Sequence, residues 1–277
     1  MSRISLYKIL TINFFLLLFF SFQNILFAFE QNIIQYPDKT SNESPTLTQH
    51  YKGTNSKALI IYLSGGTGMH TANAFLVPFI DLTQKNSSQG RYDLVNVVSP
   101  KPLESKILDR NWFNETYKMR SDKDHLLRIE SIINYYKSKT KLPIILFGHS
   151  NGGMSIEAFL NYMIKENKIN LLNGILISES KEEILSSVIS ILKKPEINLP
   201  IILMNHKNTR CYGVNFNSQL REFEKYKEIK KSVASIITIE SGEDSTSQPC
   251  YSGYHMFALA HKEVLEKIEI ELDKIKF

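Results

Sequence analysis

The chain has 277 residues, of which 43% are hydrophobic and 22% are charged, and this fits one globular domain with a sizeable core. The formal net charge is +5, and basic and acidic residues are mixed along the chain rather than gathered in blocks. The charge pattern therefore indicates no nucleic-acid partner.

The first segment is distinct from the rest of the chain. Arg3 and Lys8 precede an apolar stretch over residues 9–29, and a small residue, Ala28, lies at its end. This order predicts a secretory signal peptide over residues 1–28, cleaved near Ala28, and hence a periplasmic or secreted protein. Because the run is long, an uncleaved membrane anchor is the alternative, and only then would a membrane be a partner. Cleavage removes two cations and no acid, which lowers the net charge from +5 to +3.

Residues 29–57 are polar, and we expect an irregular N-terminal arm with at most one edge strand near Leu47–Tyr51. From Ala58 onward, short apolar runs alternate with amphipathic segments. The runs predict strands over 58–63, 92–98, 142–147, 174–178, 199–204 and 232–240, and the segments between and after them predict helices over 72–83, 122–138, 151–164, 181–192, 218–229 and 256–275.

This alternation predicts an α/β domain over residues 58–277, with a mostly parallel sheet of about six to seven strands and helices on both faces. The connection between the last two strands is one helix, so there is no room there for a large cap domain. Residues 99–119 show no clean periodicity and are the only segment from which a lid could come.

The sequence Gly148-His149-Ser150-Asn151-Gly152 joins a predicted strand to a predicted helix. A G-x-S-x-G sequence in this position is typical of a nucleophile elbow, a sharp turn that needs small residues on either side and raises a serine hydroxyl above the sheet. The helix behind it also directs its positive dipole end toward the serine. Ser150 is therefore the predicted nucleophile, and the alternative is a glycine-rich turn without catalytic function.

A serine nucleophile needs a base, which follows the nucleophile and the acid in the chain order of this kind of site. His255 follows the last predicted strand, where such a base is expected, whereas His206 ends the preceding strand and His261 lies within the last predicted helix. We therefore predict His255 as the general base.

Two backbone amides are candidates for the oxyanion hole. The glycine-rich sequence Ser64-Gly65-Gly66-Thr67-Gly68 follows the first predicted parallel strand and lets the backbone turn its amides toward a substrate oxygen. The predicted donors are the amides of Gly66 (or Thr67) and Asn151. A phosphate-binding loop is less favoured, because no P-loop lysine follows. We expect no metal and no cofactor.

The catalytic acid is the open question. The loop after the 199–204 strand, where an acid is expected, is Asn205-His206-Lys207-Asn208-Thr209-Arg210-Cys211 and contains no carboxylate. Glu179, at the end of the neighbouring strand, is the favoured third member, because a charge beside an imidazolium outweighs a neutral amide. Asn208 is the alternative, since an asparagine orients the imidazole in some cysteine proteases.

Two cysteines, Cys211 and Cys250, are present, and in an exported protein such a pair most simply forms a disulfide. The alternative, two unrelated buried thiols, applies if the signal peptide prediction fails. A bridge would tie the loop after the 199–204 strand to the loop that carries His255.

Together, these stretches resemble a group of exported bacterial α/β hydrolases. The resemblance covers roughly residues 58–270 and rests on residues 59–68, Arg120-Ser121 with His125, the elbow, residues 206–211, and Pro249-Cys250 with His255 and Phe257. It implies an α/β-hydrolase fold, Ser150 and His255 as catalytic residues, and a Cys211–Cys250 bridge. In the hydrolases that this chain resembles, the loop before the cysteine looks like it carries aspartates where this chain has Asn208-Thr209. The resemblance therefore does not identify the acid.

The residues therefore predict a serine hydrolase, an esterase or acyl hydrolase that takes a small-molecule ester or acyl substrate. Two alternatives stay open. One is a peptidase of the same fold, and the other is a binding protein that kept the fold and lost turnover.

Overall fold

The structure is a computed structural model that describes residues 29–34, 46–66, 80, 91–98, 112–230, 234–244, 249–250 and 253–275. The described residues form one eight-stranded sheet in the order β1-β2-β4-β3-β5-β6-β7-β8. The strands are β1 (Glu30–Ile34), β2 (Thr46–Tyr51), β3 (Ala58–Leu63), β4 (Tyr92–Val98), β5 (Ile144–His149), β6 (Gly174–Ser178), β7 (Ile201–His206) and β8 (Ala234–Ile239). The helices are α3 (Trp112–Ser121), α4 (Lys123–Lys139), α5 (Gly152–Lys165), α6 (Glu182–Leu192), α7 (Phe216–Ile229) and α8 (His261–Lys274), with 3₁₀ turns at Ile169–Leu171 and Gly253–Met256.

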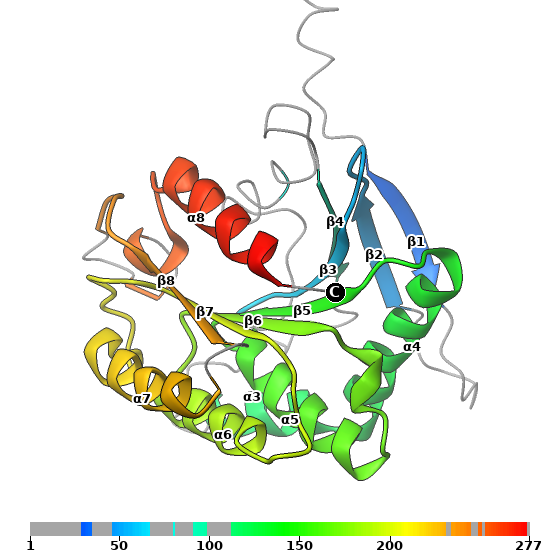
Figure 1. The fold of residues 1–277 in the computed structure, drawn as a ribbon, viewed down its shortest axis with the longest axis horizontal. Coiled ribbons are helices and arrows are strands. Elements are labelled where there is room, and N and C mark those ends of the chain that lie inside the picture. Colours follow the sequence, from blue (N-terminus) through cyan, green and yellow to red (C-terminus); the bar gives the residue numbers. More distant parts are fainter. Residues whose placement is uncertain are drawn as a thin grey trace, which may run out of the picture.

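The six strands from β3 to β8 pair in parallel, as the apolar runs predict. The side chains of β3, β5, β6 and β7 are buried on both faces, because helices cover both sides of the sheet. In β3, Leu59 and Ile61 face the core shared with α4, α5, α6 and α7, whereas Ile60 and Tyr62 face the core shared with α8. Figure 1 shows α8 on one side of the sheet and α5, α6 and α7 on the other. The predicted α/β class with a mostly parallel sheet is confirmed.

The N-terminal arm is more regular than predicted. It supplies two strands, β1 and β2, which pair antiparallel with each other and with β4. Its polar side chains find partners across the fold: Thr48 Oγ1 lies 2.9 Å from the Tyr136 hydroxyl, and His50 Nε2 lies 2.8 Å from an Asp93 carboxylate oxygen. A polar sequence can form buried strands when distant residues satisfy its hydrogen bonds, so periodicity of apolar residues did not reveal β1.

Two other segments differ from the predictions. Residues 112–119, which show no clean periodicity, belong to α3, and the buried Arg120 attaches this helix to Ser155 of α5. The last helix begins at His261 rather than at Met256, and His255 lies in the 3₁₀ turn before it.

Several predictions fall on residues outside the described ranges: the signal peptide over 1–28, nearly all of the helix over 72–83, and residues 99–111 of the candidate lid. Among the helices that the structure describes, none is both long and apolar enough to cross a membrane.

Because β3 and β5 to β8 are parallel, their carboxyl ends lie along one edge of the sheet. This edge brings together Ser64–Gly66, Ser150, Glu179, His206 and Ser241, which follow or end these five strands.

Candidate active site

Ser150 lies in a strained turn between β5 and α5. Its φ of 52° is in the left-handed region, which costs a non-glycine residue roughly 1–3 kcal/mol. The neighbouring structure enforces this conformation, since the Ser150 amide donates to the Ser178 carbonyl at 2.8 Å. The Ser150 carbonyl accepts from Gly153 N at 3.0 Å and from Ser180 Oγ at 2.7 Å. The backbone of Ser150 is thereby fixed on the neighbouring loop, and its side chain is partly exposed.

The glycines around Ser150 are required by close packing. A Cβ at Gly148 would lie 2.6 Å from the carbonyl oxygen of Gly152, and a Cβ at Gly152 would overlap the carbonyl oxygen of Leu63. Gly65 approaches from the other side, where a Cβ would lie 2.9 Å from the Cβ of Ser150. The sharp strand-to-helix turn predicted from G-x-S-x-G is therefore present, with the small residues where the backbones meet.

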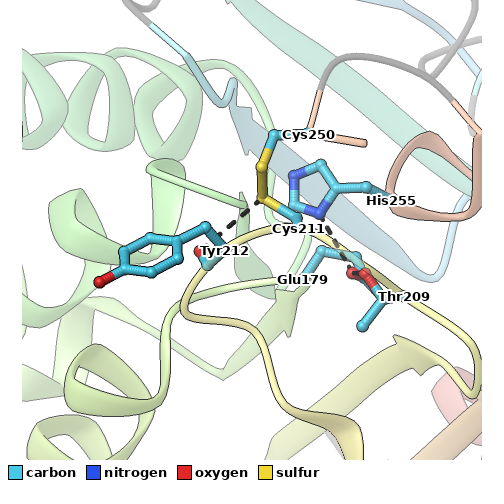
Figure 2. Close-up of a disulfide and its surroundings, with 6 residues drawn as sticks. All are labelled: Glu179, Thr209, Cys211, Tyr212, Cys250 and His255. Atoms are coloured by element: carbon cyan, nitrogen blue, oxygen red, sulfur yellow. Dashed lines mark hydrogen bonds and ion pairs between the residues drawn. A yellow bond between two sulfur atoms is a disulfide. The ribbon is translucent and has the colours of Figure 1, made fainter. Parts of the chain in front are cut away.

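His255 and Glu179 form a buried pair. His255 Nδ1 lies 3.1 Å from Glu179 Oε2, and both side chains are fully buried. The same Oε2 accepts from Thr209 Oγ1 at 2.5 Å, and Oε1 accepts from the amide of His206 at 2.5 Å. A carboxylate at Nδ1 holds the proton there, which leaves Nε2 as the basic nitrogen. Figure 2 shows Glu179, Thr209 and His255 converging beside the disulfide.

Of the two candidate acids, Glu179 is the one in contact with His255. Its φ of 49° turns the residue out of β6, and Asn205 Oδ1 accepts a hydrogen bond from its amide at 2.8 Å. Asn208 is exposed, and its backbone amide donates to His206 Nδ1 at 3.0 Å. Thr209, which holds the carboxylate, was not predicted, and the only signal for it was its place in the loop after β7.

In the described part of the chain no hydrogen bond joins Ser150 to His255. His255 Nε2 is buried, and no described residue is its hydrogen-bond partner. The ring of His149, the residue before Ser150, lies 5.1 Å from the ring of His255. The imidazole of His255 therefore lies near the turn that carries Ser150, and in catalytic sites such hydrogen bonds often tighten only when substrate binds.

The loop that carries His255 is fastened to the loop after β7. The predicted Cys211–Cys250 disulfide is present, with 4.5 Å between the Cα atoms. Beside it, Arg210 pairs with Asp244 at 2.8 Å, so this aspartate on the histidine's own loop is engaged elsewhere. Tyr212, next to the disulfide, points away from His255 in Figure 2.

His206 also connects these two loops. Its ring stacks on Tyr254 at a centroid distance of 4.1 Å, and its Nε2 lies 2.9 Å from the carbonyl oxygen of Ser241. Because Nδ1 accepts from the Asn208 amide, Nε2 carries the proton and donates it to Ser241. His206 therefore holds the two loops together.

Glu263, in the first turn of α8, secures the start of the same loop. Its carboxylate accepts from the Ser241 amide at 2.8 Å, the Ser241 hydroxyl at 2.6 Å and the Glu240 amide at 3.1 Å. Lys267 Nζ lies 2.6 Å away. Burial alone would raise the pKa of Glu263, but the hydrogen bonds from Lys267, Ser241 and Glu240 outweigh it and lower the pKa to about 2.

The two predicted oxyanion donors flank Ser150. Neither the Gly66 amide nor the Asn151 amide donates a hydrogen bond to another described residue. Asn151 Nδ2 donates to the Gly66 carbonyl at 3.3 Å and so links the two segments, while Gly66 has a φ of 56° that favours glycine. Asn151 is the N-cap of α5, whose dipole favours negative charge at this end. Thr67, the alternative donor, lies outside the described residues.

The arrangement offers a hydroxyl, an imidazole with a buried carboxylate behind it, and two backbone amide donors. This set suits attack on a carbonyl carbon. Within the described ranges, no group of three or more His, Cys, Asp or Glu side chains is placed to hold a metal ion.

No protein-family model matches the sequence, and no curated protein matches it. Solved structures do match. TT1662 from Thermus thermophilus is 13% identical with a TM-score of 0.54 over 89% of this chain and 99% of that one. XC6422 from Xanthomonas campestris, an α/β serine hydrolase without a lid, is 6% identical with a TM-score of 0.54 over 89% and 94%.

An acylaminoacyl peptidase from Pyrococcus horikoshii is 12% identical with a TM-score of 0.57 over 92% of this chain. The match spans only 43% of the peptidase. At these identities the likeness establishes the fold, and the chain has the α/β-hydrolase fold.

Proposed function

We propose that the protein is a serine hydrolase that acts on a small-molecule ester or acyl substrate through an acyl-enzyme on Ser150. The observation that carries the proposal is the buried pair of His255 Nδ1 and Glu179 Oε2, 3.1 Å apart, on the same sheet edge as Ser150 in its strained turn. Strained backbone and a buried ionisable pair at one edge of a sheet are typical of catalytic sites.

In the proposed reaction, Ser150 Oγ attacks the acyl carbon while His255 Nε2 takes the hydroxyl proton. The oxyanion that forms accepts from the amides of Gly66 and Asn151. The Oγ–C bond stays, the bond to the leaving group breaks, and His255 returns the proton to the leaving group. Water then attacks the acyl carbon while His255 takes its proton, the Oγ–C bond breaks, and His255 returns the proton to Ser150 Oγ as the acid leaves. Glu179 stabilises the imidazolium at both stages.

Two alternatives are tested by the same experiment. The binding-protein hypothesis rested on the missing acid after β7, and the contact between Glu179 and His255 supports an acid from β6 instead. A peptidase uses the same groups, and one structural neighbour bears the name of a peptidase.

The experiment uses the full oxidised protein with a fluorophosphonate probe, followed by a panel of acyl esters and peptide amides. We expect labelling at Ser150, no labelling of Ser150→Ala, and turnover of esters. A folded wild-type protein that stays unlabelled and inactive would refute the enzyme proposal and favour a binding protein. Turnover of amides with no turnover of esters would favour a peptidase.

We also propose that the protein is exported, with residues 1–28 removed. The basic and apolar N-terminus and the Cys211–Cys250 bridge support this, because disulfides persist in oxidising compartments. Mass spectrometry of the protein from its native host should give an N-terminus near Phe29. A retained residue 1 would instead support a membrane anchor.

A further inference from the structure

Arg120, near the end of α3, is a buried cation beneath the glycine-rich loop after β3. Its side chain is 3% exposed. Nη2 donates to the carbonyls of Ser64 at 2.9 Å and Gly66 at 3.0 Å, and lies 3.5 Å from that of Gly65. Nη1 donates to Ser155 Oγ at 2.8 Å. Three consecutive backbone carbonyls thus converge on one guanidinium group.

The charge has no acidic partner among the described residues, since all the oxygens that Arg120 contacts are neutral. Burial lowers the pKa of the guanidinium to about 10, so the side chain remains a cation at neutral pH. A buried, unpaired charge destabilises a fold. Its retention beneath a loop of backbone carbonyls indicates a role in that loop.

The orientation of the peptide groups follows from these contacts. In a trans peptide the C=O and the next N–H point in opposite directions, and no described peptide is cis. The carbonyls of Ser64 and Gly65 point at Arg120, so the amides of Gly65 and Gly66 point away from it. Gly65 lies against Ser150, and the Gly66 amide has no hydrogen-bond acceptor among the described residues.

We propose that Arg120 is a positioning residue for the oxyanion hole: it holds the carbonyls of Ser64–Gly66 so that the Gly66 amide faces the reacting acyl oxygen. The cation also lies behind the aligned peptide dipoles, where it polarises them in the direction that favours an oxyanion. This inference rests on the proposed function, because the oxyanion forms only if Ser150 attacks an acyl group.

Hydrogen bonds from α4 and α5 orient the guanidinium group of Arg120. Ser155 Oγ, on α5, accepts from Arg120 and lies 2.9 Å from His125 Nε2 on α4. Burial, together with the nearby Arg120 charge, lowers the pKa of His125 to about 3. His125 is therefore neutral at working pH, and its Nε2 accepts the Ser155 proton while Ser155 accepts from Arg120. The motif residues Arg120 and His125 thus belong to one chain of hydrogen bonds that ends at the loop.

The test compares Arg120→Met, Arg120→Lys and a matched control, Arg128→Met. Arg128 is also buried, but it bonds to Asp124 and to Thr46 of β2, on the part of the sheet that carries no site residue. Acylation is measured as the burst of p-nitrophenol from p-nitrophenyl acetate, alongside kcat, KM and thermal unfolding.

We expect Arg120→Met to lower the acylation rate and kcat by about 10²–10³-fold with KM within about threefold, as for loss of an oxyanion donor. Arg120→Lys should recover at least tenfold of this loss, because it keeps the charge. Arg128→Met should lower Tm and leave kcat within about twofold. If Arg120→Met keeps kcat within threefold of wild type, or changes kcat and Tm no more than Arg128→Met does, the inference is wrong.

A second measurement needs no turnover. Hydrogen exchange of the peptide that spans residues 58–66 should accelerate in Arg120→Met and not in Arg128→Met. Unchanged exchange overturns the anchoring role even in an active enzyme. If exchange accelerates but wild type shows neither a burst nor probe labelling, the anchor stands and the proposed function fails.

Discussion

Glu179→Gln changes one atom of a buried carboxylate on which three donors converge. These donors are the His206 amide, the Thr209 hydroxyl and His255 Nδ1. A glutamine has one carbonyl oxygen and one NH₂ group, so one of the two sides must place a donor against a donor. If the NH₂ group faces His255, Nδ1 must accept, and the proton moves to Nε2, which can then no longer act as a base.

Two effects contribute to the expected loss of kcat. The imidazolium loses its carboxylate, and part of the population adopts the wrong tautomer. The corresponding change in the acid of a Ser-His-Asp triad, Asp to Asn, lowers kcat by about 10⁴-fold. We therefore expect a loss of about 10³–10⁴-fold in kcat, which corresponds to about 4–5 kcal/mol of transition-state stabilisation. An unpaired buried donor should also cost about 1–3 kcal/mol of unfolding free energy.

The assay measures kcat on the best ester of the panel and the rate of fluorophosphonate labelling, with thermal unfolding as a check on folding. Glu183→Gln, an exposed change at the start of α6, is the matched control and should leave kcat within twofold. Asn208→Ala should stay within about threefold, since in the described part of the chain no hydrogen bond joins this exposed residue to His255. If folded Glu179→Gln keeps more than a tenth of wild-type kcat, or if Asn208→Ala shows the larger loss, Glu179 is not the acid.

Three further predictions concern the loop that carries His255 and the turn at Ser150. Replacing Cys211 and Cys250 by serine opens a bridge across a sequence separation of 39 residues, and the chain-entropy model gives a loss of about 4 kcal/mol, seen as a Tm lower by roughly 10 °C; an unchanged Tm under the same conditions contradicts this. Glu263→Gln should destabilise the protein at pH 7 by at most about 3 kcal/mol. The pKa of Glu263 is lowered from 4.5 to about 2 by folding, so this difference is complete above pH 4.5 and disappears as the pH falls toward 2; urea unfolding at several pH values measures it, and a constant difference refutes the assignment. Gly65→Ala places a methyl group against Ser150 and should lower kcat by about 10–100-fold with little change in Tm, because small displacements at the reacting centre are costly; wild-type kcat would show that the loop can shift.

Much of the fold could be predicted from local sequence. The six parallel strands are runs rich in apolar residues, and the amphipathic segments between them became α4 to α7. The turn at Ser150 was also predictable, because its glycines are required by contacts with residues that the strand-turn-helix sequence itself places nearby. His255 was predicted from its place after the last strand, which depends only on element order.

The identity of the acid could not be decided in this way. Glu179 and His255 are 76 residues apart, and the usual position after β7 holds no carboxylate, so the sequence favoured Glu179 and left Asn208 as the alternative. The positive φ of Glu179 and the donors Thr209 and His206 bring the carboxylate across from β6. These contacts exist only once β6, β7 and β8 lie side by side.

The same distinction, between local patterns and contacts of residues distant in sequence, applies to the other features of the protein. The sequence by itself determined the strands through their local periodicity, and the strand-turn-helix at Ser150 through steric contacts between near neighbours. It also determined the disulfide pair, because the chain has only two cysteines. The tertiary structure decided the strand β1 of the N-terminal arm, the choice of Glu179 over Asn208 at His255, and the place of Arg120 beneath Ser64, 56 residues away. In each of these, a polar group is buried against a partner distant in sequence, and hydrogen-bond complementarity of that kind leaves no periodic trace in either segment.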